Sequence, residues 1–290
     1  MAERLSITFI DVGWGDSILV ESEDAQGTSY YGLVDSNDTV HQPSSLLFLK
    51  RFFERKGVPF KRPARVFRFV LLTHTHADHA AGLPRLLRQF GADDFLYSAS
   101  SSPSDPLLAQ IVRYASRPSA RLGATSPVNY GTVLSHIPFG SVKLDVLWPD
   151  VGFFDADENN HSVVLALTLN KVSFVLTADA TADIWPNIVS RLAAGVQVFQ
   201  VPHHGAFNGT FDAAGTTPWV SYFAGGGAPG QFAVSCHPRP HGHPDGNVIR
   251  TLGRTFANPA GNTSIRRTDL DYQLRFETDG WSTRSYYTHD

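Results

Sequence analysis

The chain has 290 residues, of which 42% are hydrophobic and 18% charged, and its formal net charge is -3. This composition is typical of a globular protein with a full core and excludes a disordered chain. The slight negative charge argues against an extended duplex-binding surface, which needs many Lys and Arg contacts to phosphates, but it does not exclude a phosphate-rich substrate. The single cysteine, Cys236, excludes an internal disulfide and a cysteine-type zinc site.

No segment carries a recognisable targeting or membrane signal. The first residues lack a basic stretch followed by an apolar one, so we expect no signal peptide. No stretch is apolar for long enough to cross a bilayer. We therefore expect a soluble, cytoplasmic protein without a membrane partner, built as one large α/β domain or two small ones.

The N-terminal part predicts an antiparallel meander. Residues 5–9, 18–21 and 30–35 are apolar, strand-like runs, and a Gly-rich turn at 11–17 separates the first two. No helical pattern lies between these runs, so short turns should connect neighbouring strands.

A basic segment follows, between residues 50 and 68. It overlaps a helical pattern at Ser44–Lys56, and phenylalanines alternate with its charges. The pattern fits either a solvated helix face with its loop or a nucleic-acid-binding patch. Its basic residues are Lys50, Arg51, Arg55, Lys56, Lys61, Arg62, Arg65 and Arg68.

The densest group of ligand-type side chains lies between an apolar run, Phe67–Leu72, and a helical pattern at Leu83–Phe90. Four such residues occur within six positions: His74, His76, Asp78 and His79. The first two histidines are two residues apart, so in extended backbone they point to the same side. The aspartate and the third histidine follow where the chain turns, and they can face a second point. Each of these two pairs of residues could bind one of two neighbouring divalent cations, because imidazole and carboxylate groups both bind such ions.

Later in the chain, ligand-type residues again border predicted strands. A predicted hairpin begins after His161 and ends before Asp179, and the next apolar run ends before His203 and His204. A single histidine at a strand end is more often structural. Buried carboxylates and imidazoles without partners are costly unless a metal compensates them, so the repeated arrangement favours a metal site.

The remaining elements follow from local patterns. Apolar runs predict strands at residues 142–148, 163–169, Val172–Leu176, 196–201 and 232–236. Helical patterns predict short helices at 107–114 and 245–252, and residues 266–276 and 281–287 predict a closing hairpin. Residues 98–106 and 117–130 are rich in Ser, Pro and Gly and are predicted loops.

The segment from His74 to His79 resembles the His-x-His-x-Asp-His signature of the metallo-β-lactamase superfamily at all four positions. It differs from the helical His-Glu-x-x-His of metalloproteases. The resemblance implies an α/β fold, a four-layer αββα sandwich of two mixed β-sheets flanked by helices, with a mono- or dinuclear metal site at one edge of the sheets. It spans nearly the whole chain, which favours a single domain over residues 1–290.

Further motifs resemble a narrower group, the metallo-β-lactamase domain of the DNA-uptake protein ComEC. They are Asp-Val-Gly-Trp-Gly-Asp-Ser at 11–17, Glu-Asn-Asn-His-Ser at 158–162, Thr-Ala-Asp-Ala at 177–180 and His-His-Gly at 203–205. Phosphorylcholine esterases are similar too, and they carry a histidine at the position of His161. Trp14 stands where the ComEC-type group usually has glutamine, Ala178 replaces a usual glycine, and Ala206 replaces a common serine.

This resemblance implies a ligand set for two metal ions. His74, His76 and His161 would bind one ion. Asp78, His79 and His204 would bind the other, with Asp179 bridging. His203 would lie beside the ions and face the substrate, although the choice between His203 and His204 as ligand stays open. Zinc is the expected cation, and manganese is the alternative because the second set mixes carboxylate with imidazole.

Two further groups of residues would support the ions and the substrate. Asp11, Asp16 and Asp35 would brace the metal loops through hydrogen bonds. His243 belongs to a Gly-His-Pro element that resembles one at the substrate edge of the ComEC-type domain. A Pro/His loop of this kind is also compatible with simple turn chemistry, so substrate contact and a structural role are both open.

The resemblance implies a dinuclear-metal-dependent hydrolase, namely a phosphodiesterase or nuclease acting on nucleic acid or a small phosphodiester. A hydroxide shared by the two cations would attack phosphorus. The catalytic residues would be Asp78, which orients the hydroxide, and His203, which absorbs charge on the phosphoryl oxygens. Either His203 or His243 would protonate the leaving group.

Two alternatives remain. A lactam, lactone or thioester hydrolase shares the metal chemistry but predicts a Gly-His-x-x-Gly element, which the chain lacks in recognisable form. A non-catalytic metal-binding module predicts loss of some ligands, whereas every position is filled.

Overall fold

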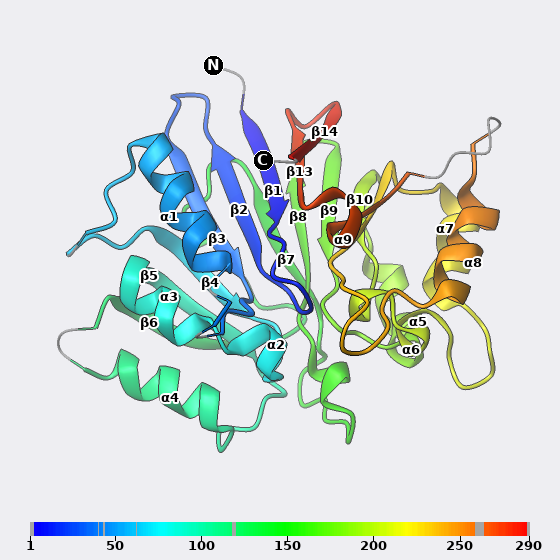
Figure 1. The fold of residues 1–290 in the computed structure, drawn as a ribbon, viewed down its shortest axis with the longest axis horizontal. Coiled ribbons are helices and arrows are strands. Elements are labelled where there is room, and N and C mark those ends of the chain that lie inside the picture. Colours follow the sequence, from blue (N-terminus) through cyan, green and yellow to red (C-terminus); the bar gives the residue numbers. More distant parts are fainter. Residues whose placement is uncertain are drawn as a thin grey trace.

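The computed structural model describes residues 3–39, 41–42, 44–61, 63–117, 120–258 and 264–288. Two mixed β-sheets pack against each other in the centre, and helices cover the outer face of each sheet (Figure 1). This arrangement confirms the predicted four-layer αββα sandwich. The single domain expected for residues 1–290 stays a prediction.

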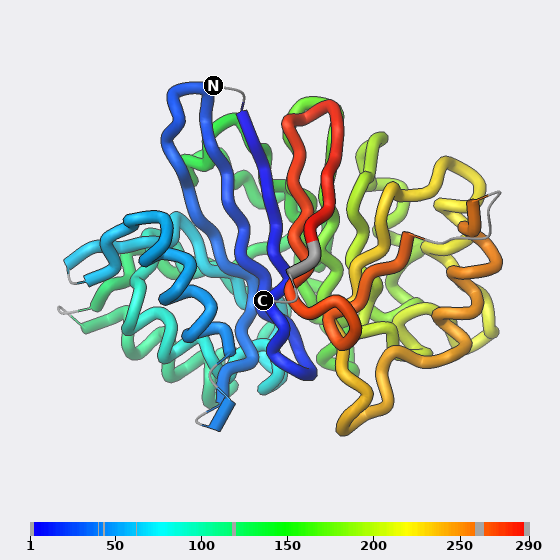
Figure 2. The backbone as a smooth tube through the Cα atoms, turned by 45° about the horizontal axis from the view of Figure 1, so that its top comes forward, coloured from blue at the N-terminus to red at the C-terminus, as the bar shows by residue number. Residues whose placement is uncertain are grey.

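One sheet has eight strands within the described residues, in the spatial order β14-β13-β1-β2-β3-β4-β5-β6. The predicted meander of β1, β2 and β3 is confirmed as antiparallel, whereas β3, β4, β5 and β6 are parallel. The C-terminal hairpin returns to pair with β1, so both ends of the chain meet in one sheet (Figure 2). The strands are β1 (Arg4–Phe9), β2 (Ile18–Glu23), β3 (Ser29–Val34), β4 (Phe67–Leu72), β5 (Ala92–Ser98), β6 (Leu122–Val128), β13 (Gln273–Thr278) and β14 (Thr283–Thr288).

The second sheet has six strands among the described residues, in the order β12-β11-β10-β9-β8-β7. The β7, β8 and β9 strands are antiparallel, and β9, β10, β11 and β12 are parallel. The strands are β7 (Lys143–Trp148), β8 (Val164–Leu169), β9 (Val172–Leu176), β10 (Val196–Gln200), β11 (Gln231–Val234) and β12 (Ile265–Arg267).

Three hydrophobic clusters separate the four layers. The inner cluster joins the facing sides of both sheets, and the alternation along β4 shows how: Phe69 and Leu71 lie in the inner cluster, while Phe67 and Leu72 pack outward. Both faces of β4 are buried along most of its length, which is why five of its six residues are apolar, Arg68 being the exception. The outer face of the larger sheet packs against α1 (Ser44–Lys56), α3 (Leu83–Phe90) and α4 (Pro106–Ala115). The outer face of the smaller sheet packs against α5 (Trp185–Ile188), α7 (Pro218–Gly226) and α8 (Gly246–Phe256).

One predicted loop is wrong, because residues 122–128 form β6. This strand contains Gly123 and Pro127, which favour turns in a sequence pattern. It is an edge strand, where proline is tolerated because one side of the strand needs no ladder hydrogen bond. Strand β5 had no predicted counterpart either, since Asp93 and Asp94 interrupt its apolar pattern.

Within the described residues, three of the eight basic residues of the segment between residues 50 and 68 form ion pairs with acids. Lys56 Nζ lies 2.7 Å from Glu21 Oε1, and Arg68 Nη1 lies 2.8 Å from Asp93 Oδ2. Arg65 Nη1 is 3.8 Å from the same carboxylate, whereas Arg62 lies outside the described residues. These pairs offset part of the positive charge of this segment, and the choice between a solvated helix face and a nucleic-acid-binding patch stays open.

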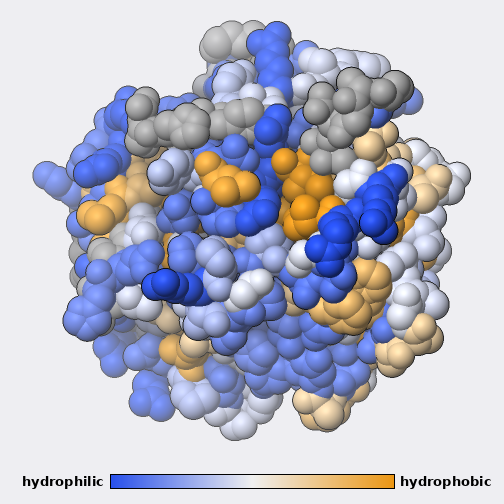
Figure 3. Space-filling view, turned by 45° about the vertical axis from the view of Figure 1, so that its right-hand side comes forward, coloured by the Kyte–Doolittle hydropathy of each residue, from blue (hydrophilic) through white to orange (hydrophobic). Residues whose placement is uncertain are grey.

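None of the helices in the described part of the chain combines the length and apolar composition that a bilayer crossing requires. On the face shown in Figure 3, hydrophilic side chains dominate and hydrophobic ones form patches between them.

Candidate metal centre

The ligand-type residues meet at one edge of the two sheets, at the ends of strands. His74 and His76 follow β4, and Asp78 and His79 lie in the short helix α2 (Ala77–Ala80). Asp179 follows β9 of the other sheet. His203 and His204 follow β10 in a short 3-10 helix, His203–Gly205. Because β9 and β10 are parallel, their carboxyl ends reach the same edge.

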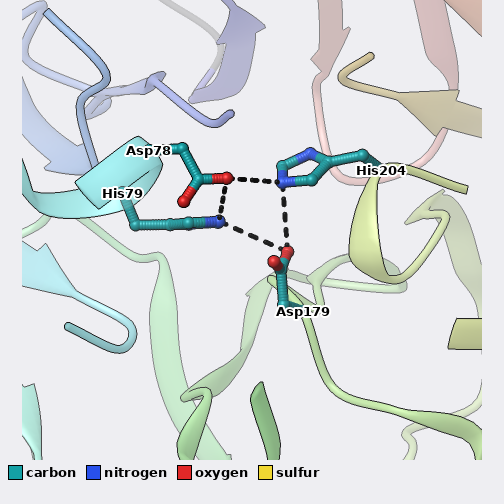
Figure 4. Close-up of side chains that lie close together, drawn as sticks. All are labelled: Asp78, His79, Asp179 and His204. Atoms are coloured by element: carbon teal, nitrogen blue, oxygen red, sulfur yellow. Dashed lines mark ion pairs between the residues drawn. The ribbon is translucent and has the colours of Figure 1, made fainter. Parts of the chain in front are cut away.

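Four of these side chains point toward a common centre (Figure 4). His204 Nε2 lies 3.4 Å from Asp78 Oδ2 and 3.3 Å from Asp179 Oδ1. His79 Nε2 lies 3.3 Å from the same Asp179 oxygen and 3.7 Å from Asp78 Oδ2. All four ligand atoms are within 4.8 Å of one another. The arrangement is that of four ligands around one cation.

A second group shares one member with the first. His74, His76 and Asp179 also offer ligand atoms within 4.8 Å of one another. His74 Nε2 lies 3.8 Å from Asp179 Oδ2, and the rings of His74 and His76 are 4.7 Å apart. Asp179 thus presents Oδ1 to the first group and Oδ2 to the second, as a bridging ligand would.

The donor atoms fit divalent cations. The buried atoms His74 Nε2, His79 Nε2, His204 Nε2 and Asp179 Oδ1 have no hydrogen-bond partner among the described residues. Leaving several buried polar atoms unsatisfied is costly, and native proteins avoid it. Cations bound between the imidazoles and the carboxylates would satisfy all of these atoms.

His161 lies outside the cluster. Its Nε2 donates to the backbone oxygen of Asp155 at 2.9 Å, and its ring lies against that of Phe154, with centroids 5.4 Å apart. The cause is local: residues Glu158–His161 form a 3-10 turn, and β8 begins only at Val164, so His161 does not begin the strand. From the same turn, Glu158 Oε2 approaches His76 Nε2 at 3.3 Å. The structure therefore does not bring the third histidine of the implied first set to the metal centre.

The expected bracing by Asp16 and Asp35 is present as hydrogen bonds. Asp35 accepts from the backbone N and the hydroxyl of Thr73 at 2.8 and 2.6 Å, and from His79 Nδ1 at 2.8 Å. Asp16 Oδ2 accepts from Gln200 Nε2 at 2.7 Å. Such partners fix the tautomer and orientation of a ligand histidine. Asp11, in contrast, accepts from the backbone N of Gly13 within its own turn.

Two bracing residues had no sequence signal of their own. Gln200 ends an apolar strand and also accepts from the backbone N of Thr177, so it connects the loops after β9 and β10. Ser235 accepts a hydrogen bond from His204 Nδ1 through its backbone oxygen at 2.9 Å. The only sequence feature that could indicate a role for Gln200 is its position as a polar residue at the end of an apolar strand.

The loops at the site adopt an uncommon backbone conformation. Asp35, Ala178, His203 and His204 have φ values of 56°, 47°, 53° and 53°. This left-handed region is unfavourable for residues other than glycine, and such strain concentrates at functional sites. Ala178 thus adopts a backbone conformation that glycine reaches without strain.

The charges of the cluster depend on one another. Burial opposes ionisation of His79, but the carboxylates of Asp179, Asp78 and Asp35 outweigh it and raise its pKa well above the usual value. Burial likewise opposes the charged form of His204, and Asp179 again raises its pKa. For Asp179 the burial effect is outweighed by His204 and His79, which hold its pKa well below the usual range. His74, without a close carboxylate on each side, has its pKa lowered by burial and by His79.

A pocket of about 220 Å³ opens in front of the cluster. Asp78, Asp179 and His204 line its floor, and His203 and His243 line its wall. His203 Nε2 is 3.6 Å from Asp179 Oδ2, and the rings of the two wall histidines are 5.9 Å apart. The structure thus places His204, rather than His203, among the four converging ligand atoms. A larger groove, of about 800 Å³, runs along β7 but holds none of these residues.

The fold and the cluster define an αββα protein with a candidate site for two divalent cations. Residues 61–214, just over half of the chain, match the family model described as the Metallo-beta-lactamase superfamily. The chain belongs to this superfamily, whose members are typically metal-dependent hydrolases.

Solved structures are similar only in fold. The metallo-β-lactamase MIM-1 from Novosphingobium pentaromativorans is 19% identical, with a TM-score of 0.39 over 68% of this chain and 76% of that one. A long form RNase Z from yeast is 12% identical, with a TM-score of 0.47, and the match covers 84% of this chain but 39% of that one. No curated protein sequence matches the chain.

Proposed function

We propose that the protein is a dinuclear-metal-dependent phosphodiesterase or nuclease. The observation that carries the proposal is the Asp179 carboxylate, which offers one oxygen to each of two adjacent ligand groups. A site of this kind serves in-line displacement at phosphorus, since paired cations stabilise both the attacking and the leaving oxygen. The ComEC-type and phosphorylcholine-esterase motifs support a phosphodiester rather than a lactam as substrate.

The residues have distinct roles in this proposal. Asp78, His79 and His204 hold one ion, His74 and His76 hold the other, and Asp179 is shared. When bound, two divalent cations lower the pKa of water at the site and stabilise charge on phosphoryl oxygens. Zinc suits the imidazole-rich set, and manganese remains the alternative because of its carboxylates.

The pocket wall supplies hydrogen bonds to the substrate. His203 is the proposed proton donor to the leaving group, because its ring faces the pocket beside Asp179 and its buried Nδ1 has no hydrogen-bond partner among the described residues. Burial and the neighbouring His204 lower the pKa of His243 to about 4. His243 is therefore neutral at pH 7 and suits binding of a phosphoryl oxygen through its N–H better than proton donation.

A substrate panel tests the function. The protein, loaded with zinc or manganese, is incubated with bis-p-nitrophenyl phosphate, single-stranded and duplex DNA, cyclic nucleotides and nitrocefin. We expect hydrolysis of at least one phosphodiester. Turnover of nitrocefin without any phosphodiester would replace the proposal by a lactam hydrolase.

Variants connect the activity to this site. We expect Asp179→Ala and His76→Ala to lower turnover by more than a hundredfold, because each removes a proposed metal ligand. The matched control is His136→Ala, since His136 is 57% exposed and lies beside Asp94 away from the pocket. If the two ligand variants kept activity within tenfold of the parent while remaining folded, the site would be wrongly assigned.

A further inference from the structure

The pocket in front of the cluster has an aromatic wall that the proposed chemistry does not require. Trp14, in the turn after β1, lines this pocket together with Asp78, Asp179 and His203. The ring of Trp14 lies edge-on to that of His241, with centroids 5.1 Å apart and planes at 67°. His241 in turn lies 5.9 Å from His243, with nearly parallel planes. A continuous row of rings therefore runs from Trp14 to the histidines beside the metal centre.

The backbone around Trp14 is fixed to the metal-binding loops. Gly15 has a φ of +96°, and a Cβ added there would lie 2.4 Å from the backbone oxygen of Asp78. The next amide, Asp16 N, donates to that same oxygen at 3.2 Å. Ser235 Oγ donates to the backbone oxygen of Gly15 at 2.8 Å, and Asn37 Nδ2 donates to that of Trp14. The backbone that carries the indole is thus fixed by these contacts, which reduces the entropy lost when a ligand packs against the ring.

Trp14 does not contribute to the hydrophobic core, so core packing does not explain the presence of a tryptophan at this position. Trp148, Trp185 and Trp219 are fully buried, and each indole N–H donates to a backbone oxygen. Trp14 is partly exposed and belongs to none of the three hydrophobic clusters. No hydrogen bond of its indole N–H to another described residue is present. Its large apolar face is therefore available to a ligand in the pocket.

We propose that Trp14 is a stacking platform for a nucleobase, so that the proposed phosphodiesterase acts on nucleotide substrates rather than on small aliphatic phosphodiesters. This inference rests on the proposed function. Bases stack on exposed aromatic side chains in proteins that bind single-stranded nucleic acid, largely independently of sequence. A base on Trp14 would leave its phosphate near His203 and the metal ligands, because all of these residues line one pocket of about 220 Å³. His241 would fix the platform by its edge-on contact.

Two chromogenic esters separate base recognition from the chemistry. Thymidine 5′-(p-nitrophenyl phosphate) and methyl p-nitrophenyl phosphate share a leaving group and differ in the nucleoside. We expect Trp14→Ala to lower the preference for the thymidine ester, measured as the ratio of the two kcat/KM values, about tenfold, mainly through the KM of the thymidine ester. Trp14→Phe should restore most of the preference, because the phenyl ring keeps a stacking face.

The control for this measurement is Trp281→Ala. Trp281 is 71% exposed, lies between β13 and β14, and does not line the pocket. It should leave the substrate preference within twofold of the parent. If Trp14→Ala left the preference for the thymidine ester unchanged, or if Trp281→Ala changed it equally, the proposed stacking role of Trp14 would be wrong. The metal content of each variant, measured by elemental analysis, shows that the metal centre is intact.

A binding measurement keeps this inference distinct from the proposed function. Thymidine 5′-monophosphate is titrated into the zinc-loaded protein while tryptophan fluorescence is followed. We expect saturable quenching in the parent and its loss in Trp14→Phe, because stacking on the indole quenches its emission. If the parent hydrolysed neither of these esters nor any phosphodiester of the substrate panel, the phosphodiesterase function would fail, while Trp14-dependent quenching would still support a nucleotide platform. Absence of quenching in the parent would overturn the platform whatever the activity.

Discussion

His79 has a carboxylate at each ring nitrogen. Its Nδ1 donates to Asp35 Oδ2 at 2.8 Å, and its Nε2 lies 3.3 Å from Asp179 Oδ1. Without a metal, both nitrogens satisfy their neighbours best as donors, so the ring is an imidazolium and its pKa is raised. With a cation at Nε2, the ring is neutral and keeps only the bond to Asp35, which is the usual carboxylate–histidine–metal arrangement.

Metal binding should therefore release protons. Neighbouring carboxylates raise the pKa of His79 and of His204 well above the usual value in the metal-free protein, so a cation must displace protons that these imidazoles hold. We expect protons to be released on saturation with zinc, and an affinity that rises with pH. Calorimetric titrations in buffers of different ionisation enthalpy measure the proton release. Binding enthalpies that do not depend on the buffer would contradict the prediction.

Variants of His161 and His76 distinguish the ligand set implied by the resemblance from the candidate set whose side chains converge in the structure. We expect His161→Gln to retain two metal ions per chain, because the ring bonds to the Asp155 backbone rather than to the cluster. His76→Ala should lose one ion, since His76 belongs to the second ligand group. Elemental analysis after gel filtration gives both stoichiometries. Loss of an ion in His161→Gln alone would restore His161 as a ligand.

At the scale of elements, the turn that contains Gly15 packs directly against the short helix α2, which contains Asp78. A side chain at Gly15 would be strained by the positive φ and would also collide with the Asp78 backbone. Gly215 has a similar φ of +76°, but a Cβ there would meet nothing within 4 Å. A comparison of alanine substitutions at Gly15 and at Gly215 therefore separates the effect of backbone strain from that of steric overlap.

Gly15→Ala should cost more stability than Gly215→Ala. Left-handed strain costs roughly 1 kcal/mol in both variants, and overpacking adds about 1–3 kcal/mol in Gly15→Ala alone. Metal affinity should also fall in Gly15→Ala, because Asp78 must move. Urea denaturation and zinc titration of both variants measure these effects. Equal losses of unfolding free energy would show that the collision is relieved without cost.

Elements with strong local signals were predicted well. The bounds of α1, α3, β4 and β9 agree with the sequence patterns, because apolar periodicity and end signals are local properties. Strands β5 and β6 were missed, since polar and turn-forming residues mask them and pairing with neighbouring strands stabilises them.

The residue types that form the site could be predicted from the sequence, but the directions in which their side chains point could not. His74 to His79 and Asp179 follow strands, so their convergence was foreseeable from the pattern of strand followed by ligand. The orientation of His161 depends on the 3-10 turn before β8, and the contact of Trp14 with His241 joins segments more than two hundred residues apart. Neither is encoded by a local pattern, because each depends on how segments pack in three dimensions.

At the scale of the whole molecule, the candidate metal centre joins the two sheets. Its proposed ligands follow β4 in the eight-stranded sheet and β9 and β10 in the six-stranded sheet. The inner hydrophobic cluster also joins these sheets, and it contains none of the proposed ligands. The sandwich should therefore form without metal, whereas the edge that carries the site should depend on it.

Removal of metal should lower the stability of the protein without abolishing the fold. A ligand that binds only the native state stabilises it by RT ln(1 + [L]/Kd), which is about 4 kcal/mol at a thousandfold excess over Kd. We expect the Tm to rise with free zinc concentration and to fall on chelation, while far-UV circular dichroism shows both sheets retained below the transition. Asp179→Ala should lose most of the zinc-dependent shift, since its carboxylate serves both ligand groups. A Tm that is independent of zinc would mean that the buried imidazoles and carboxylates stabilise one another as ion pairs and hold no metal.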